Sequence, residues 1–250
     1  MRPLLQRLKP TSGVSHFLHL ILLVILPAAV FILVRLNFVQ LALSIIVLSK
    51  WRMFAVRPRF WAANVRANAV DLMVGVSIVL FTTHASGQVW LQLLLAVLYA
   101  VWLIAIKPAT GLPMITAQAF IGQLTALMAL YLTWTNGPVY GLTLITGLIC
   151  FLAARHYFDA FEETYARMLS YIWGYFGAAL AWLLSHWLLY YHGLAQPTLL
   201  LSALGYGLAV LYYLDHNDKL SRGMRRQFIF IMLAIVLVVL AYSDWGNKVV

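Results

Sequence analysis

Two short polar segments carry most of the side chains that could perform chemistry. Residues 155–167 read Arg-His-Tyr-Phe-Asp-Ala-Phe-Glu-Glu-Thr-Tyr-Ala-Arg, and residues 215–218 read Asp-His-Asn-Asp. Together they hold five of the seven acidic residues and two of the seven histidines. Imidazole and carboxylate groups bind divalent cations and activate water, but the spacing here fits no established metal motif. A turn held by salt bridges is the other interpretation, and we expect no bound metal and no cofactor.

One of these segments resembles a known catalytic motif. Glu162-Glu163-Thr164-Tyr165-Ala166-Arg167 is similar to the EExxxR motif of the CPBP (CAAX-type) intramembrane endopeptidases, and Trp182 to His186 is similar to their FxxxH motif, with Trp in place of Phe. The resemblance implies an intramembrane hydrolase whose candidate catalytic residues are Glu162, Glu163, Arg167, His156 and His216. Glu163 and His186 lie about 23 residues apart in one expected span, roughly 35 Å. Only a helix break, for example at Gly174 or Gly177, would let them share a water molecule.

A basic and aromatic segment follows the second apolar run of the chain. Lys50 to Pro58 reads Lys-Trp-Arg-Met-Phe-Ala-Val-Arg-Pro and resembles KxxxxxxRP, the first motif of the type-2 phosphatidic acid phosphatases. The catalytic histidines that this family implies have no counterpart, because Gln88 follows Ser86-Gly87 and no histidine follows Ser221. Guanidinium forks nevertheless suit phosphate groups. We therefore expect headgroup contacts from Arg52, Arg57, Arg59 and Arg66. Ordinary anchoring at the cytoplasmic surface is the alternative.

A third group of polar residues falls inside the apolar runs. Asn64, Asn68, Asp71 and Gly75 would share one face of a continuous helix. Asp71 is the only acidic residue inside an expected span, and such a carboxylate should face the bundle and find a partner. Gln118 and Gln123 lie in or beside a stripe of small residues, which either lines a path or lets helices pack closely.

Composition identifies the solvent in which these residues must work. Of the 250 residues, 64% are hydrophobic and 10% are charged, whereas soluble domains are roughly a quarter charged. Mean hydropathy is +0.89. These values exclude a soluble enzyme, a nucleic-acid binder and a disordered scaffold. We expect a single transmembrane domain over residues 1–250, an all-α polytopic bundle, with the only cysteine, Cys150, in its core.

Nine apolar runs suggest about nine transmembrane helices with a cytoplasmic N-terminus. They are Phe17–Leu36, Phe38–Ser49, Ala69–Thr83, Val89–Ile106, Met114–Trp134, Tyr140–Ala154, Met168–Tyr191, Thr198–Leu214 and Phe228–Tyr242. This alternation puts all but two of the 17 basic residues on the inner side, as the positive-inside rule requires. The second run is too short to cross about 30 Å of hydrocarbon. It either continues through residues 50–54 or forms an N-terminal hairpin that turns near Asn37, which leaves seven spans.

These patterns favour a multi-pass protein of the bacterial inner membrane rather than a particular reaction. We expect the first run to be an uncleaved span and residues 155–167 to form a short amphipathic helix at the inner interface. The leading hypothesis is a protein that binds or moves an anionic lipid or a lipid-linked phosphate at the cytoplasmic leaflet. The alternatives are the intramembrane hydrolase and a structural subunit of a membrane complex. Expected partners are membrane lipids and no nucleic acid, with a membrane protein partner or a second copy of the chain as further candidates.

Overall fold

The computed structural model describes residues 14–134, 137–185, 190–191 and 194–243 of the chain. The described residues form two compact units. Unit 1 contains the described residues up to Trp51 together with Ile78–Ala109, and unit 2 contains Arg52–Ser77 together with the described residues from Thr110 onward. The prediction of one domain over residues 1–250 stays a prediction, and each unit is considered by itself.

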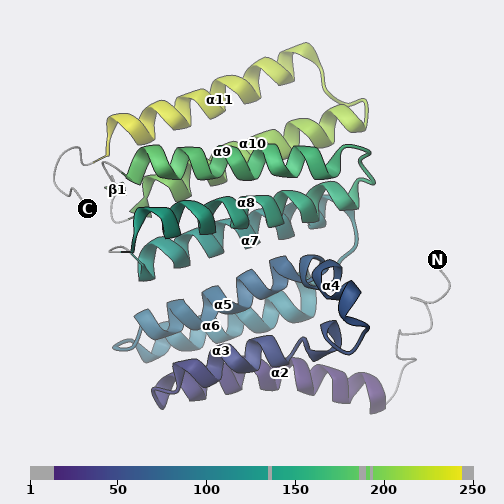
Figure 1. Cartoon of the computed structure of the whole chain (residues 1–250), viewed down its shortest axis with the longest axis vertical. Coiled ribbons are helices and arrows are strands. Elements are labelled where there is room, and N and C mark those ends of the chain that lie inside the picture. Colours follow the sequence, from purple (N-terminus) through teal and green to yellow (C-terminus); the bar gives the residue numbers. More distant parts are fainter. Residues whose placement is uncertain (1–13, 135–136, 186–189, 192–193, 244–250) are drawn as a thin grey trace. The chain divides into compact units, whose positions relative to one another are not determined.

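Helices account for nearly all of the regular structure in the described residues (Figure 1). The α-helices are α2 (Val14–Arg35), α3 (Val39–Leu48), α4 (Trp61–Ala67), α5 (Ala69–His84), α6 (Val89–Val101), α7 (Leu112–Thr133), α8 (Val139–Ala160), α9 (Ala166–Ser185), α10 (Gln196–His216) and α11 (Arg222–Ala241). Shorter elements are η1 (Trp51–Met53), η2 (Pro58–Phe60), the π-helical η3 (Trp102–Ile106) and an antiparallel pair of two-residue strands, β1 (Tyr190–Tyr191) and β2 (Leu194–Ala195). The all-α prediction is confirmed.

Six of the described helices are long and apolar enough to cross a membrane: α6 with η3, α7, α8, α9, α10 and α11. A seventh span results if Pro58–Ala67 and Ala69–His84, which meet at a bend of 65°, count as one. Among the described residues, this count falls short of nine because three apolar helices are too short to be counted alone: Leu23–Arg35, α5 with 16 residues, and α3 with 10 residues, about 15 Å of helix. Six such helices indicate an integral membrane protein.

Helix ends in this chain follow from local sequence. Pro113 and Pro197 lie in the first turns of α7 and α10, where proline costs no hydrogen bond. The Ser221 hydroxyl caps α11 by accepting a hydrogen bond from the Met224 backbone N–H at 3.2 Å. Three helices end instead on a non-glycine residue with positive φ: Asn37 (62°), Glu162 (52°) and Asp218 (54°). Each is followed by the 6→1 backbone hydrogen bond of a Schellman motif, for example Glu163 N–H to Phe158 C=O at 3.3 Å.

In unit 1, α2 and α3 lie side by side after the turn at Asn37, and α2 also packs on α6. The predicted turn near Asn37 is confirmed. α3 does not continue as an α-helix through residues 50–54, because it ends at Leu48 and η1 begins at Trp51. A buried amide ties α5 to α6, since Gln92, 1% exposed, donates to the Thr82 carbonyl at 2.9 Å.

In unit 2, α8 packs closely along α9, and α7 packs on both α8 and α10. Small residues permit the α8–α9 contact: a Cβ on Gly174 would lie 2.9 Å from Phe151 Cβ and 3.0 Å from the Gly147 carbonyl oxygen. Buried Cys150 lies against Gly177 in the same interface, as expected of a core residue. The core beneath includes Leu127, Leu142 and Leu201, each at most 1% exposed.

Two local predictions are wrong. Residues 155–167 do not form a separate interfacial helix: α8 continues to Ala160, a turn covers residues 161–165, and α9 begins at Ala166. The continuous face from Asn64 to Gly75 is also broken, because α4 ends and α5 begins around Asn68. The Asn68 side chain donates to the Asn64 carbonyl at 2.9 Å, which is how asparagine competes with the helical backbone.

Candidate functional site

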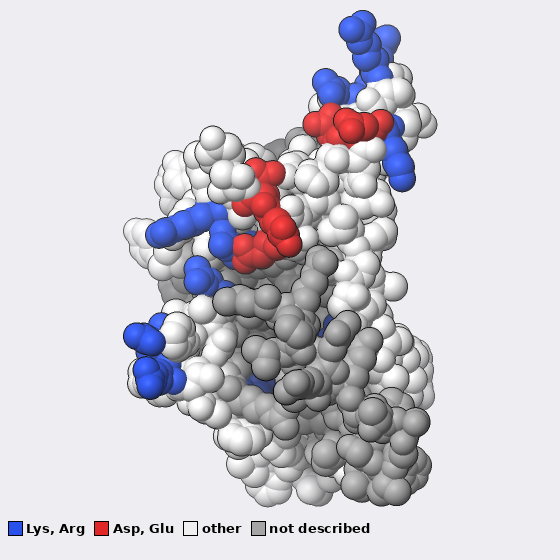
Figure 2. All heavy atoms as spheres, turned by 90° about the vertical axis from the view of Figure 1, so that its right-hand side faces the viewer, with Lys and Arg blue, Asp and Glu red and all other residues white. Residues whose placement is uncertain are grey.

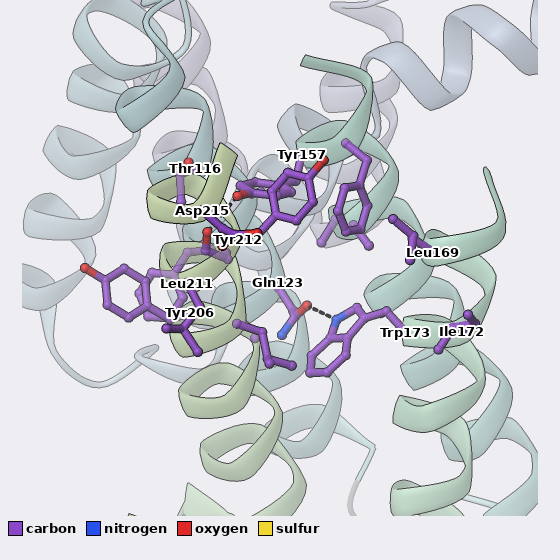
Figure 3. A pocket seen from close by; sticks show the side chains of 18 of the residues that line it. Thr116, Gln123, Tyr157, Leu169, Ile172, Trp173, Tyr206, Leu211, Tyr212 and Asp215 are labelled. Carbon is purple, nitrogen blue, oxygen red and sulfur yellow. Dashed lines mark hydrogen bonds between the residues drawn. The ribbon is translucent and has the colours of Figure 1, made fainter. Parts of the chain in front are cut away.

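A cavity of about 470 Å³ lies in unit 2, among α7, α8, α9 and α10 (Figure 3). This volume is within the roughly 300–1,000 Å³ typical of small-molecule sites. Its lining is mainly aliphatic and aromatic, and we call it the α7–α10 pocket. The lining residues used below are Thr116, Ala119, Gln123, Ala154, Tyr157, Phe158, Trp173, Gly205, Ala209, Tyr212, Asp215 and Arg225.

The inner end of the pocket is closed by a hydrogen-bonded set of residues from three helices. The Trp173 indole N–H donates to Gln123 Oε1 at 2.9 Å, as drawn in Figure 3. Gln123 Nε2 in turn donates to the Leu201 carbonyl at 3.0 Å. A Cβ on Gly205 would lie 3.0 Å from both Trp173 Cζ2 and Gln123 Nε2. We call Gln123, Trp173 and Gly205 the pocket floor; Trp173 also packs on the core cluster that contains Leu201.

Aromatic side chains form the wall of the pocket toward the α8–α9 turn. The Tyr157 hydroxyl donates to the Ala209 carbonyl at 2.7 Å, which joins α8 to α10. Tyr157 and Phe158 meet the Tyr212 ring edge to face, with centroids 5.9 and 5.3 Å away. Phe161, 7% exposed, packs into the same cluster. The wall therefore satisfies its own polar groups and presents mainly carbon to the cavity.

The outer end of the pocket, its mouth, carries charge. Asp215 and Arg225 both line the pocket and form an ion pair at 3.4 Å, with side chains 67% and 59% exposed. Arg225 lies in the first turn of α11, between Arg222 and Arg226. The α8–α9 and α10–α11 turns emerge at this end of unit 2, and Figure 2 looks onto it, showing acidic and basic side chains gathered there. The pocket thus runs from an apolar interior to an ionic mouth.

The α8–α9 turn is tied to α10 by one hydrogen bond. The Tyr212 hydroxyl donates to Glu163 Oε2, and the Tyr165 backbone N–H donates to Glu163 Oε1 at 3.3 Å. The bond from Tyr212 is the main cause that lowers the pKa of the Glu163 carboxyl below its ordinary value of 4.5. The His216 ring stacks on Tyr212 at 6.0 Å. Glu163 is therefore held as a carboxylate beside the aromatic wall.

The residues predicted for a hydrolase are divided rather than gathered. Glu163 and His216 both lie beside Tyr212, but Glu162 is exposed in the turn. Arg167 lies over the Tyr171 ring at 5.7 Å. His156 Nε2 is 3.1 Å from Gln118 Oε1, so this histidine is engaged with α7. His186, of the FxxxH-like stretch, lies outside the described residues.

Two further observations concern these polar segments. The expected salt bridge within residues 155–167 is present between Arg155 and Asp159 at 2.9 Å. Over the part of the chain that the structure describes, no three His, Cys, Asp or Glu side chains gather closely enough to hold a metal ion.

From Arg52 onward, the basic segment lies in unit 2 and is folded and largely exposed. The Trp61 indole donates to the Val56 carbonyl at 3.0 Å, and Phe54 meets the Trp61 ring edge to face at 5.5 Å. The arginines that the structure describes here point outward: Arg57, Arg59 and Arg66 are exposed, and the Arg59 guanidinium lies 4.6 Å from the centre of the Phe60 ring. Arg52 lies in η1. Their predicted headgroup role stays a prediction.

The predicted intramembrane polar residues occupy different places. Asp71 is 6% exposed in the first turn of α5, and Asn64 donates to the Met53 carbonyl at 3.3 Å. Of the residues predicted in α7, Gln123 reaches the pocket floor, whereas Gln118 meets His156. The stripe of small residues is divided between two places: Thr116 and Ala119 line the pocket, while Gly122 packs closely against Val70 of α5, and a role in lining a path stays a prediction.

Sequence reasoning missed three contributors to the pocket. Trp173 lies in the middle of an apolar run, away from the interfaces where tryptophan anchors spans. An indole N–H at that depth needs an acceptor, and the amides of Gln118 and Gln123 were candidates, so the sequence indicated the type of partner. Gly205 and the Asp215–Arg225 pair had none, because their proximity depends on how α9, α10 and α11 are arranged.

No protein-family model matches the chain, and comparison with curated proteins and with solved structures likewise found no match. The class of protein therefore rests on the fold and the site: an all-α integral membrane protein with a largely apolar pocket that has an ion pair at one end.

Proposed function

We propose that this chain binds an anionic membrane lipid, with one hydrocarbon chain in the α7–α10 pocket and the headgroup at the mouth. The observation that carries the proposal is the polarity gradient of the cavity. Aromatic and aliphatic side chains surround its interior, and Asp215 and Arg225 lie at its charged end. Pockets of this kind bury the apolar part of a ligand and orient it with a few polar groups.

The depth of the pocket suits one leaflet. From Gly205 at the floor to Asp215 at the mouth, α10 rises about 15 Å. This is about half of the roughly 30 Å hydrocarbon core of a bilayer. A lipid in the leaflet next to the charged end could therefore place its hydrocarbon chain in the pocket while its headgroup stays at the membrane surface.

The charges at the mouth favour an anionic headgroup. Arg222, Arg225 and Arg226 occupy the first turns of α11, where backbone N–H groups and the helix dipole also favour negative charge. In the structure, the Asp215 carboxylate forms an ion pair with Arg225. Both side chains are more than half exposed, so this ion pair is weak and another anion can take the place of Asp215. A phosphate or carboxylate headgroup would replace Asp215 as the partner of Arg225.

The topology that we infer with this function has the charged end of unit 2 in the cytoplasm of a bacterial cell, as the positive-inside rule favours. The α2–α3 hairpin and the 10-residue length of α3 support seven spans plus an N-terminal hairpin over nine spans. In this arrangement the arginines of residues 52–66 would face the same leaflet and hold bulk anionic lipid. An intramembrane hydrolase and a structural subunit are the other candidate functions, and no contact among the described residues favours either of them over lipid binding.

Native mass spectrometry of the purified protein tests the proposal, with phosphatidylglycerol and phosphatidylcholine as probes. We expect wild type to retain phosphatidylglycerol preferentially. Ala154→Phe, which places a ring in the pocket, should abolish retention, whereas Leu148→Phe on the exposed side of the same helix should not. Equal retention by wild type and Ala154→Phe would refute the pocket as the site.

The headgroup contact has its own pair of variants. Arg225→Gln should weaken retention of phosphatidylglycerol about fivefold, equivalent to roughly 1 kcal/mol, while Arg222→Gln, outside the pocket, should have a smaller effect. Asp215→Asn should strengthen retention, because it removes the carboxylate that competes for Arg225. A stronger loss in Arg222→Gln than in Arg225→Gln would contradict this placement of the headgroup.

A further inference from the structure

The floor of the α7–α10 pocket is built differently from its walls. The walls present mainly carbon to the cavity, whereas the floor includes a buried amide in a chain of two hydrogen bonds, from the Trp173 indole to Gln123 and from Gln123 to the Leu201 carbonyl. Gln123 is 5% exposed, so breaking either bond would leave a buried amide unsatisfied. This floor therefore resists displacement by an incoming hydrocarbon chain.

Packing contacts from α9, α10 and the core also hold the pocket floor in place. Trp173 stacks on Phe176 with centroids 5.4 Å apart, and it packs on the core cluster that contains Leu201, itself fully buried. On the side of α10, Gly205 leaves just enough room for the indole: a Cβ there would lie 3.0 Å from Trp173 Cζ2. A larger residue at position 205 would have to move the floor, and a smaller one at position 173 would lower it.

We propose that Gln123, Trp173 and Gly205 set an upper limit to the length of the hydrocarbon chain that the pocket accepts. This inference rests on the proposed lipid binding and specifies its ligand: an anionic amphiphile whose chain ends within one leaflet, about 15 Å from the mouth. Each methylene group that enters an apolar site improves affinity about fourfold. Methylene groups beyond the floor have no place in the pocket and add nothing.

The test uses single-chain alkyl phosphates of increasing length, with affinity measured by native mass spectrometry on the full-length protein. For wild type, affinity should rise about fourfold per methylene group and then level off. For Trp173→Leu, the levelling length should become longer. Trp182→Leu, on the same helix and 49% exposed, is the matched control and should level off where wild type does.

A second variant moves the limit the other way. Gly205→Ala should shorten the levelling length, and it decides the question if Trp173→Leu does not fold. Unchanged levelling lengths in folded variants, with binding intact, would overturn the length limit and leave lipid binding standing. Failure of wild type to bind any alkyl phosphate, or equal affinity at every length, would overturn both proposals.

Discussion

Tyr212 performs two tasks at the residue scale. Its ring forms part of the aromatic wall with Phe158 and Phe161, and its hydroxyl holds Glu163 of the α8–α9 turn. The lowered pKa of Glu163 means that the folded state prefers the carboxylate. A group with a depressed pKa contributes stability that is fully present above its ordinary pKa and is lost as the pH falls through the lowered value.

Tyr212→Phe should therefore destabilise the protein in a pH-dependent way. The difference in melting temperature between wild type and Tyr212→Phe should be largest above pH 4.5 and should shrink as the pH falls below it. Thermal melts across this range in a non-ionic detergent provide the measurement. A difference that grows as the pH falls would contradict the hydrogen bond to a carboxylate.

Asp71 is a second acidic residue whose charge should affect stability. Its side chain is more than nine-tenths buried in the first turn of α5. Removing one partner of a buried polar interaction lowers the free energy of unfolding by about 1–3 kcal/mol, and by more when the group is charged. Asp71→Asn should lower the melting temperature or cellular function more than Asp218→Asn, an exposed loop change. Equal thermal stability and growth for the two variants would remove this role for Asp71.

Buried polar contacts were predictable from sequence only where one residue implied the type of its partner. Asp71 was predicted to face the helix bundle because a carboxylate inside an apolar run is costly to expose to lipid. The Gln123–Trp173 bond was within reach for the same reason. The Asp215–Arg225 and Tyr212–Glu163 pairs were not, because exposed charges have many possible partners and only the turns bring these together.

Turns decide the structure at the element scale. The prediction of a separate helix over residues 155–167 rested on the spacing of its aromatic residues, which α8 and the Schellman turn equally satisfy. Glutamate rarely occupies the left-handed position that glycine normally fills, so Glu162 gave no stop signal. Asn37 and Asp218 are more usual at such positions, and the turn near Asn37 was predicted.

Glu162→Gly should stabilise the protein by about 1 kcal/mol, because glycine adopts positive φ without the steric cost that a Cβ brings. We expect a rise in melting temperature of about 2–4 °C for a chain of this size. Glu162→Ala keeps the Cβ and serves as the control, with no gain expected. A melting temperature for Glu162→Gly no higher than that of Glu162→Ala would contradict a steric cost of the Cβ at this positive φ.

Composition and apolar runs determine the outline of the whole molecule. Each of the nine runs falls largely within a described helix, because long apolar segments have few alternatives to helix in lipid. The number of spans was harder to predict, since it depends on whether short helices such as α3 cross, turn back or bend. The pocket was beyond prediction for a related reason: its lining residues come from five helices and their turns, and their proximity depends on how those helices pack.

The inferred topology makes a prediction for the intact membrane. Single cysteines at positions 56 and 223, beside Arg57 and Arg225, should both be protected from an impermeant thiol reagent added outside cells and should react after permeabilisation. Cys150→Ala provides the background for this experiment, because the native cysteine is buried. Labelling of the two positions from opposite faces of the membrane would disprove the inferred topology, in which both basic segments face the cytoplasm.

Photolabelling with a phosphatidic acid analogue shows whether a lipid chain enters the α7–α10 pocket. The probe carries a diazirine near the end of one acyl chain, and adducts are mapped by peptide mass spectrometry. We predict adducts around Gln123, Trp173 and Gly205 at the floor, and their loss in Ala154→Phe. Adducts confined to outward-facing positions such as Phe230 or Tyr175, 71% and 78% exposed, would show that lipid only surrounds the protein and would contradict the account.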